Sequence, residues 1–309
     1  MMNIAKKKIW AVAGGKGGVG KSFLSTNLGI DLAQKGHRVA LIDADFGGAN
    51  LHTFFGVYNS KISISDFINS NRLNLEEILL PTEVPNLMLA SGAYDVMSMA
   101  NPKQVQQSKL VKAIQNLKDF DHVVIDLGAG VANYTLDLFL LATSGILITA
   151  PEPTSVENTY RFIKSAFYRK LKNVILHPEV RNFLEQMSES KKEDHPKTPA
   201  ELVSRISSIN NQAGETLKYE IAAFKPKLVL NQVRTATDIR VGFSMKQACI
   251  KYFGINIDYA GFVEQDNVAL QSIRSRQPVL LYAPNSQVAQ SIRRVGHNIR
   301  QNYHLVPTN

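Results

Sequence analysis

The residues best suited to chemistry in this chain form one glycine-rich run, GGKGGVGKS, over residues 14–22. From Gly15 to Ser22 the run fits the pattern G-x-x-x-x-G-K-[ST], which is typical of loops that bind polyphosphate. Such a loop presents backbone N–H groups and the N-terminus of the following helix to the phosphates. We expect Lys21 to reach the β- and γ-phosphates and the Ser22 hydroxyl to be a Mg²⁺ ligand. The candidate phosphate-binding residues are Gly15, Gly17, Gly18, Val19, Gly20, Lys21, Ser22 and Phe23.

The same loop contains a second lysine, Lys16, which phosphate binding by this motif does not require. One interpretation is a solvated surface lysine. The other is that Lys16 also contacts phosphate, including the nucleotide of a second subunit. The spacing of the motif leaves both interpretations open.

Two apolar stretches end in aspartate: VVID ends at Asp126, and LIDAD carries Asp43 and Asp45. Carboxylates at the carboxyl ends of strands can hold Mg²⁺ directly or through water. We predict that Asp126 is a Mg²⁺ ligand, that Asp43 supports the ion through water, and that Asp45 orients or deprotonates the attacking water. A helix N-cap is the structural alternative for Asp126.

Alternating apolar and helical patterns supply the elements that would position these residues. Apolar runs predict strands at 8–13, 39–42, 87–90, 122–125, 146–150, 227–230 and 259–263. Helical periodicity separates them, notably at 21–35, 103–118 and 154–171. This alternation predicts an α/β fold, a doubly wound, mostly parallel sheet flanked by helices, with its ligand at the carboxyl ends of the strands.

We expect a single domain over residues 1–309, with an insertion at 175–222 that departs from the alternating pattern. This segment is polar and charged, and it predicts one or two helices, one of them over 198–210, with an exposed loop near 187–197. A passive spacer and a lid that binds a partner remain open for this insertion.

Composition limits the class of protein. A hydrophobic content of 44% is globular. The single cysteine, Cys249, provides neither an intrachain disulfide nor the usual cysteine pair of an iron–sulfur site, which indicates a reducing, cytoplasmic compartment. The longest apolar stretch, 136–150, contains polar residues and is too short to span a bilayer, and the first residues lack the pattern of a secretory signal.

The net charge of +9 is unevenly distributed. Residues 161–309 carry 22 Lys and Arg against 12 Asp and Glu, so the basic surplus lies in the second half of the chain. Solubility, nucleic acid, anionic lipid and an acidic protein partner are the four open interpretations of this surplus.

Several motifs together resemble the MinD/ParA family of deviant Walker-A ATPases: Lys16 and Lys21 in GGKGGVGKS, Asp45 in LIDADFGGANL, and Asp126 in VVIDLGAG. The resemblance continues in TAPEPTSVENTY (149–160), LVLNQVR (228–234) and GFVEQDNVALQSIRSRQPVLL (261–281). It covers most of the chain except 175–222.

The resemblance implies ATP and Mg²⁺ as cofactors, an ATP-dependent homodimer and an activating protein partner. Lys21 would bind phosphate within its own subunit, Lys16 would reach the partner's ATP, and Asp45 would set up the hydrolytic water. The adenine and ribose contacts would come from Asn231, Val263 and Asp266. Hydrolysis would then release the two subunits, which makes the protein a timed switch.

Within this family, the segment DFGGANL (45–51) followed by FFG (54–56) most resembles the FlhG/FleN-like branch, whose members set flagellar number and position. The N-terminal activating extension of many members has no counterpart here, and the 175–222 insertion is not typical of them. A ParA-like partition ATPase that binds DNA nonspecifically as an ATP dimer is the alternative.

Two further expectations concern partners and localisation. The lack of a second cysteine argues against an iron–sulfur carrier. The apolar stripe of Val288, Ile292, Val295 and Ile299 predicts a last helix packed on the domain rather than a membrane anchor. We expect a cytoplasmic protein, and recruitment to DNA, to a membrane surface or to a cell pole stays open.

Overall fold

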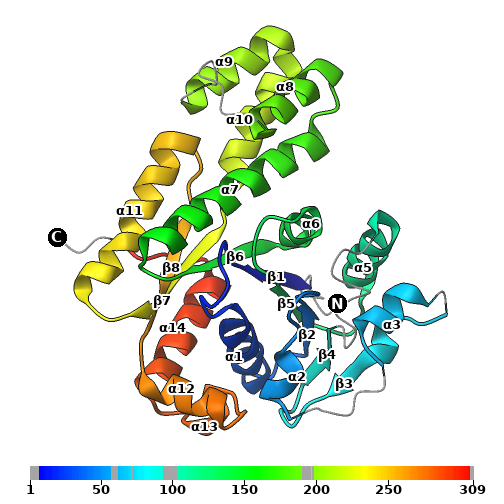
Figure 1. Ribbon diagram of the computed structural model, residues 1–309, viewed down its shortest axis with the longest axis vertical. Helices are drawn as coiled ribbons and strands as arrows, with labels where there is room; N and C mark the ends of the chain where they lie inside the picture. The colour runs from blue at the N-terminus through cyan, green and yellow to red at the C-terminus, as the bar shows by residue number, and fades with distance from the viewer. Residues whose placement is uncertain are drawn as a thin grey trace, which may run out of the picture.

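The computed structural model describes residues 7–56, 62–70, 72–92, 103–189, 196 and 198–306. Within these residues, eight strands form one sheet in the order β3-β4-β2-β5-β1-β6-β7-β8 (Figure 1). Every neighbouring pair is parallel except β3 with β4. The strands are β1 (Lys8–Ala13), β2 (Val39–Ala44), β3 (Leu79–Pro81), β4 (Leu87–Ala90), β5 (His122–Leu127), β6 (Ser144–Thr149), β7 (Lys227–Val233) and β8 (Asp258–Glu264).

The predicted α/β fold with a mostly parallel sheet is confirmed, and each predicted strand has a counterpart. The antiparallel strand at one edge, β3, was not predicted from the sequence. Its three residues, ending in Pro81, are too few to give an alternating pattern, and proline in a sheet is confined to such edges.

Helices cover both faces of the sheet (Figure 1). They are α1 (Lys21–Gln34), α2 (Leu51–Phe54), α3 (Ile64–Asn69), α5 (Gln104–Asn116), α6 (Asn133–Leu141), α7 (Pro153–Val174), α8 (Pro178–Glu189), α9 (Pro199–Ile209), α10 (Asn211–Ala223), α11 (Ala236–Phe253), α12 (Asn267–Arg274), α13 (Val279–Tyr282) and α14 (Gln287–Gln301), with a short 3₁₀ helix, η1, at Glu76–Ile78.

Every strand except β3 divides its side chains between two hydrophobic cores. In β1, Ile9 and Ala11 belong to the core shared with α5, α6, α7 and α11, whereas Trp10 and Val12 belong to the core shared with α1, α13 and α14. Both faces of the sheet are therefore apolar, which explains why its strands read as continuous hydrophobic runs rather than as an alternation.

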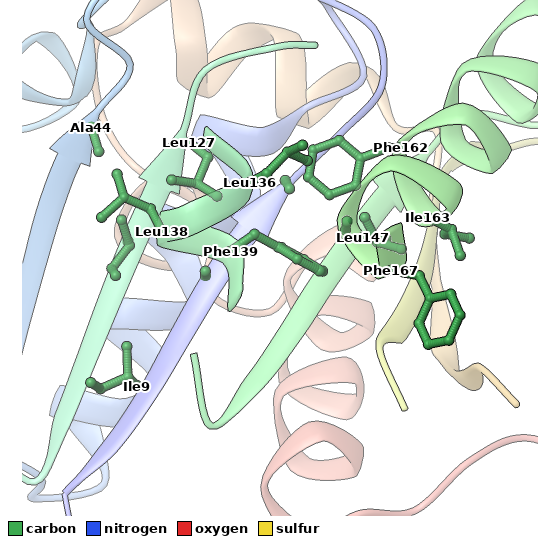
Figure 2. Packing of buried hydrophobic residues seen from close by; sticks show 14 of the residues in the cluster. Ile9, Ala44, Leu127, Leu136, Leu138, Phe139, Leu147, Phe162, Ile163 and Phe167 are labelled. Atoms are coloured by element: carbon green, nitrogen blue, oxygen red, sulfur yellow. The ribbon is translucent and has the colours of Figure 1, made fainter. Parts of the chain in front are cut away.

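Figure 2 shows part of the first core, where Phe139 of α6 and Phe162 of α7 lie together beside the strands. Their rings meet edge to face, with centroids 5.0 Å apart. Gly145 of β6 makes room for this pair, because a Cβ at that position would lie 2.2 Å from the Phe139 ring. This glycine is thus required by close packing and not by its backbone conformation.

The predicted insertion at 175–222 contains three helices among its described residues, α8, α9 and α10, where the sequence analysis expected one or two. They lie along the far end of α7, away from the sheet (Figure 1). The helix expected over 198–210 is α9, whose N-cap Thr198 accepts a hydrogen bond from the Glu201 N–H. The loop expected near 187–197 falls largely outside the described residues, and 187–189 still belong to α8.

The last helix, α14, packs on the domain as predicted. Its apolar stripe, Val288, Ile292, Val295 and Ile299, is buried to at least 99% against α1 and β8. Across the described ranges, no helix combines the length and the apolar character that crossing a membrane requires.

Candidate active site

The glycine-rich loop joins β1 to α1 at the carboxyl end of the central strand, which is the strand–loop–helix context that the motif requires. Gly18 and Gly20 have φ of 78° and 98°, in the left-handed region that favours glycine. Gly20 precedes α1 without a side-chain cap, so the first N–H groups of that helix face the loop. Lys21 begins the helix and is 7% exposed.

Gly15 and Gly20 of this loop are in addition set by the close approach of distant elements. A Cβ on Gly15 would lie 2.2 Å from the Asn158 carbonyl of α7, and a Cβ on Gly20 would lie 2.2 Å from the Asn231 side-chain nitrogen of β7. The loop is therefore held between α7 and the end of β7, and larger residues would displace it from both.

Asn231, which the resemblance assigns to the adenine base, contacts the phosphate loop directly. Its side-chain Nδ2 donates a hydrogen bond to the Val19 carbonyl at 2.8 Å, and the side chain is buried. The next residue, Gln232, reaches the Gly18 carbonyl at 3.3 Å. Sequence analysis missed this role because the partners are more than 200 residues apart. The base contact of Asn231 stays a prediction.

Asp126 lies at the end of β5, beside β1, and is fully buried. Its Oδ1 accepts a hydrogen bond from the Ser25 hydroxyl at 2.8 Å, while Oδ2 is buried with no hydrogen-bond partner among the described residues. The alternative of a helix N-cap is wrong, because the next helix, α6, begins only at Asn133 with Ala132 as its N-cap. Ser25, one turn into α1, was not identified from the sequence, although a serine on a buried helix face is a signal of polar contact.

Asp43 lies next to Asp126 in the register of β2 and β5, and it too is fully buried. Its Oδ2 accepts hydrogen bonds from the backbone N–H groups of Asn50 and Leu51, at 2.9 and 3.0 Å, and its Oδ1 accepts one from the Asp45 N–H at 3.3 Å. Asp43 thus fixes the chain that leads into α2, a structural role that the sequence analysis did not anticipate.

Both neighbouring carboxyl groups have a raised pKa. Burial is the main cause that raises the pKa of both, and the charge of Asp126 raises the pKa of Asp43 further. For Asp126, the hydroxyls of Ser22 and Ser25 and the charge of Lys21 oppose the rise in pKa. Two buried like charges this close require compensation by a proton or by a cation.

A divalent cation fits this arrangement. Mg²⁺ prefers oxygen ligands and takes only one or two carboxylates from the protein. The unpartnered Oδ2 of Asp126 and the Ser22 hydroxyl supply such oxygens, and Asp43 lies beside them. In the part of the chain that the structure describes, no three His, Cys, Asp or Glu side chains gather into a metal-binding group.

Asp45 lies just beyond β2 and is partly exposed. Its Oδ1 accepts a hydrogen bond from the Gly47 N–H at 3.2 Å, and a Cβ on Gly128 would come within 3.1 Å of the same oxygen. The following residue, Phe46, is buried and packs on Tyr134 with ring centroids 5.5 Å apart. The Asp45 carboxylate therefore lies against the loop that follows β5, on an anchored segment.

Lys16 differs from Lys21 in its surroundings. Its side chain is 43% exposed at the rim of the loop, and its Nζ lies 3.4 Å from Glu152 Oε2 and 3.3 Å from Thr154 Oγ1 at the start of α7. Contacts of this length and exposure contribute little to stability. The Lys16 side chain is thus held loosely at the rim of the loop and faces solvent.

The remaining predicted residues are placed as follows. Val263 is buried near the end of β8, and Asp266 is the N-cap of α12, where it accepts a hydrogen bond from the Val268 N–H at 2.9 Å. The side chain of Phe23 is buried in the core around α1, so it is the backbone N–H of this residue that remains to contact a phosphate.

Comparisons with known proteins show which family and which fold this chain resembles. Residues 5–201 match the family described as "ParA: NUBPL iron-transfer P-loop NTPase". The fold is similar to that of the septum site-determining protein MinD from Pyrococcus horikoshii, solved in complex with Mg-ADP. The TM-score is 0.65 at 20% identity, over 96% of this chain and 97% of that chain. At this identity the likeness concerns the fold alone.

Two curated relatives share more of the sequence. The chain is 36% identical to the antiactivator FleN of Pseudomonas aeruginosa over 160 residues, 51% of this chain and 55% of FleN. It is 32% identical to the flagellum site-determining protein YlxH of Helicobacter pylori over 165 residues, 52% of this chain and 54% of YlxH. The chain thus spans about half the length of the curated relatives that it matches.

Proposed function

The chain belongs to the ParA/MinD family of P-loop NTPases, and from this premise we propose that it hydrolyses ATP with Mg²⁺ and that ATP converts it from a monomer into a homodimer. The observation that carries the proposal is the separation of the two loop lysines. Lys21 is buried at the start of α1, where its own subunit's phosphates would lie, whereas Lys16 is exposed at the rim with only long contacts. An exposed lysine at this place is available to the nucleotide of a second subunit.

The phosphates would be held by Lys21 and by the backbone N–H groups from Gly15 to Phe23. Ser22 and Asp126 would be the protein ligands of Mg²⁺, with Asp43 acting through water. When bound, Mg²⁺ neutralises the charge that develops on the phosphate oxygens.

Asp45 would orient the attacking water or take its proton. This role requires a carboxylate that is held in place yet reaches solvent, and Asp45 meets both conditions through the Gly47 hydrogen bond and its partial exposure. Asn231, Val263 and Asp266 would surround the adenine and ribose, since all three lie at the carboxyl ends of β7 and β8 or directly after them.

We further propose that residues 1–309 form one domain, into which 175–222 is inserted. Val180, Leu184, Ile206 and Leu217 of the inserted helices belong to the same hydrophobic cluster as the strand residues of the sheet, which supports a single folded unit.

At the cellular level, we propose that the switch determines the site or the number of a structure such as the flagellum, together with an activating partner. The names of the FleN and YlxH relatives support this function over partition of DNA. Such a protein would act in the cytoplasm and be recruited to a membrane or a pole while dimeric.

Three variants, at Lys21, Lys16 and Asp45, test the ATPase cycle. Two measurements are made for each: the rate of phosphate release, and the molecular mass from light scattering with ATP or ADP. Lys21→Ala should lose nucleotide binding, because it removes the phosphate lysine. Lys16→Ala should bind nucleotide and remain a monomer, and Lys118→Ala, at an exposed lysine elsewhere, is its matched control. A full ATP dimer of the Lys16 variant would contradict the role across subunits.

Asp45→Ala should form a dimer that persists, because ATP is bound and not hydrolysed. Unchanged phosphate release by this variant would refute the assignment of Asp45 to the hydrolytic water, without affecting the assignment of the two lysines.

A further inference from the structure

A cavity lies at the end of the sheet opposite the phosphate loop. Its volume is about 580 Å³, and pockets that bind small molecules usually have ~300–1,000 Å³. Four residues of its lining, Lys8, Ser144, Lys227 and Asp258, are the first residues of the adjacent strands β1, β6, β7 and β8. The phosphate loop follows the last residue of β1, so the whole length of that strand separates the two places.

Positive charge predominates in the lining. The charged side chains that line the cavity are four lysines and one carboxylate, Lys8, Lys170, Lys225, Lys227 and Asp258, with His304 beside them. One lysine is compensated, because Lys170 Nζ lies 2.7 Å from the Glu220 carboxylate. Lys8 and Lys225 are exposed and pair with no carboxylate in the described ranges, so they supply the surplus.

Lys227 is the deepest of these cations. Its side chain is 2% exposed, and its Nζ lies 3.7 Å from Asp258 Oδ2, which is longer than a normal N–H···O hydrogen bond. Burial lowers the pKa of Lys227, and the charge of Asp258 opposes this change. A buried ammonium group carries three N–H donors, and leaving them without close acceptors costs free energy. An anion in the cavity would supply the missing acceptors.

The rest of the wall is mixed, with apolar and aromatic residues beside the polar side chains of Thr143, Ser144, Asn256 and Asn302. Trp10, Phe139, Leu140, Phe224 and Pro226 line the same cavity. A fully hydrated inorganic ion gains nothing from such surfaces, whereas an organic molecule with an anionic group contacts both the apolar wall and the lysines.

We propose that this cavity binds a small organic anion, a compound in which a phosphate or carboxylate group is joined to an apolar body. Lys227, Lys225 and Lys8 hold the anionic group, and the apolar body lies against Phe224 and Pro226. This site is separate from the phosphate loop and does not depend on nucleotide binding there.

The chain offers a direct reporter, because Trp10 is its only tryptophan and lines the cavity. The full chain is titrated with phenyl phosphate, which carries both parts, and with benzoate, which distinguishes a carboxylate from a phosphate. Inorganic phosphate carries the charge alone, and benzyl alcohol carries the ring alone. We expect a saturable change in Trp10 fluorescence with phenyl phosphate or benzoate, and binding at least ~10-fold weaker for the two partial probes.

Two matched double variants locate the signal. Lys8→Gln/Lys225→Gln should weaken binding of the organic anion by about tenfold or more, because it removes two charged donors. Lys118→Gln/Lys251→Gln removes the same charge from exposed positions elsewhere and should leave the dissociation constant unchanged. Lys21→Ala should also bind as wild type, because it affects only the phosphate loop.

Four results would overturn the proposal. They are the absence of a saturable change in the wild type, equal binding by the Lys8/Lys225 variant and its control, benzyl alcohol binding as tightly as phenyl phosphate, and loss of the signal in Lys21→Ala. The last result would place the anion at the phosphate loop. All the residues replaced here except Lys21 are exposed, so circular dichroism should show unchanged folding.

Discussion

Replacing Asn231 by alanine separates two roles for this residue, one on the phosphate loop and one on the adenine base. The buried hydrogen bond to Val19 fixes the loop in the observed conformation. Its loss leaves a buried carbonyl without a partner, which costs ~1–3 kcal/mol. If this cost falls on the loop conformation that binds phosphate, affinity decreases by roughly 5- to 150-fold.

The two roles predict different losses for different ligands. Inorganic triphosphate has phosphates and no base, so an effect through the loop weakens ATP and triphosphate by the same factor in Asn231→Ala. An effect through the base weakens ATP alone. The assay is displacement of a fluorescent ADP analogue by each ligand, measured for the wild type and the variant in the presence of Mg²⁺.

Gln232→Asn is the matched control. Gln232 lies next along β7, makes the longer 3.3 Å bond to Gly18 and has a φ of 59°, a conformation that asparagine tolerates. We expect this shorter side chain to change both affinities by less than about threefold, because a long, exposed hydrogen bond contributes ~0.5 kcal/mol, the low end of the range for hydrogen bonds. A variant of Asn231 that binds triphosphate like the wild type and ATP poorly would refute the reasoning from the loop.

Three other perturbations test the fold and the cofactor assignment. Gly145→Ala should lower the free energy of unfolding by ~1–3 kcal/mol, because its Cβ would overlap the aromatic ring of α6; Gly17→Ala, which meets no atom within 4 Å, should leave the urea midpoint unchanged. Burial lowers the pKa of His122 to about 4, so its neutral ring accepts the Trp10 hydrogen bond in the folded state. The contribution of this histidine to the free energy of unfolding should therefore be fully present above pH 6.5, the ordinary pKa of histidine. It should decrease as the pH falls toward 4, by at most ~1.4 kcal/mol per pH unit. A urea midpoint that does not change with pH between these values would contradict this prediction. Cys249 is buried and burial raises its pKa to about 12, so anaerobic incubation with iron and sulfide should give no cluster absorbance, and a stoichiometric cluster would reverse that expectation.

The parts of the fold and of the site that could be predicted are those encoded by neighbouring residues. The strand before Gly14, the helix after Gly20 and the aspartates at strand ends are local patterns, and the parallel arrangement follows from their alternation. The three helices of 175–222 were undercounted because α9 and α10 follow one another with only Asn210 between them. Asn210 caps α10 with its side chain, a signal that the apolar periodicity alone does not contain.

The contacts that could not be predicted join distant parts of the chain. Ser25 to Asp126 spans 101 residues, and Asn231 to Val19 spans 212. Local patterns along the sequence do not indicate which strand ends meet in the sheet. In the observed order β5 and β6 lie beside β1, and β7 lies one strand further away. Asp43 shows the same limit, since its use as an acceptor for Asn50 and Leu51 depends on how the chain turns after β2.

The hydrogen bond from Asn231 to Val19 also has a consequence for the order in which the protein is made. The nine-residue motif leaves the ribosome early, yet the residue that fixes its shape is synthesised more than 200 positions later. A nascent chain that ends anywhere before β7 carries the motif without its anchor, so its loop lacks the hydrogen bond that fixes the loop of the finished chain. With the proposed function, tight nucleotide binding would begin only after β7 has been made, and a product truncated before β7 would compete poorly for ATP in the cell.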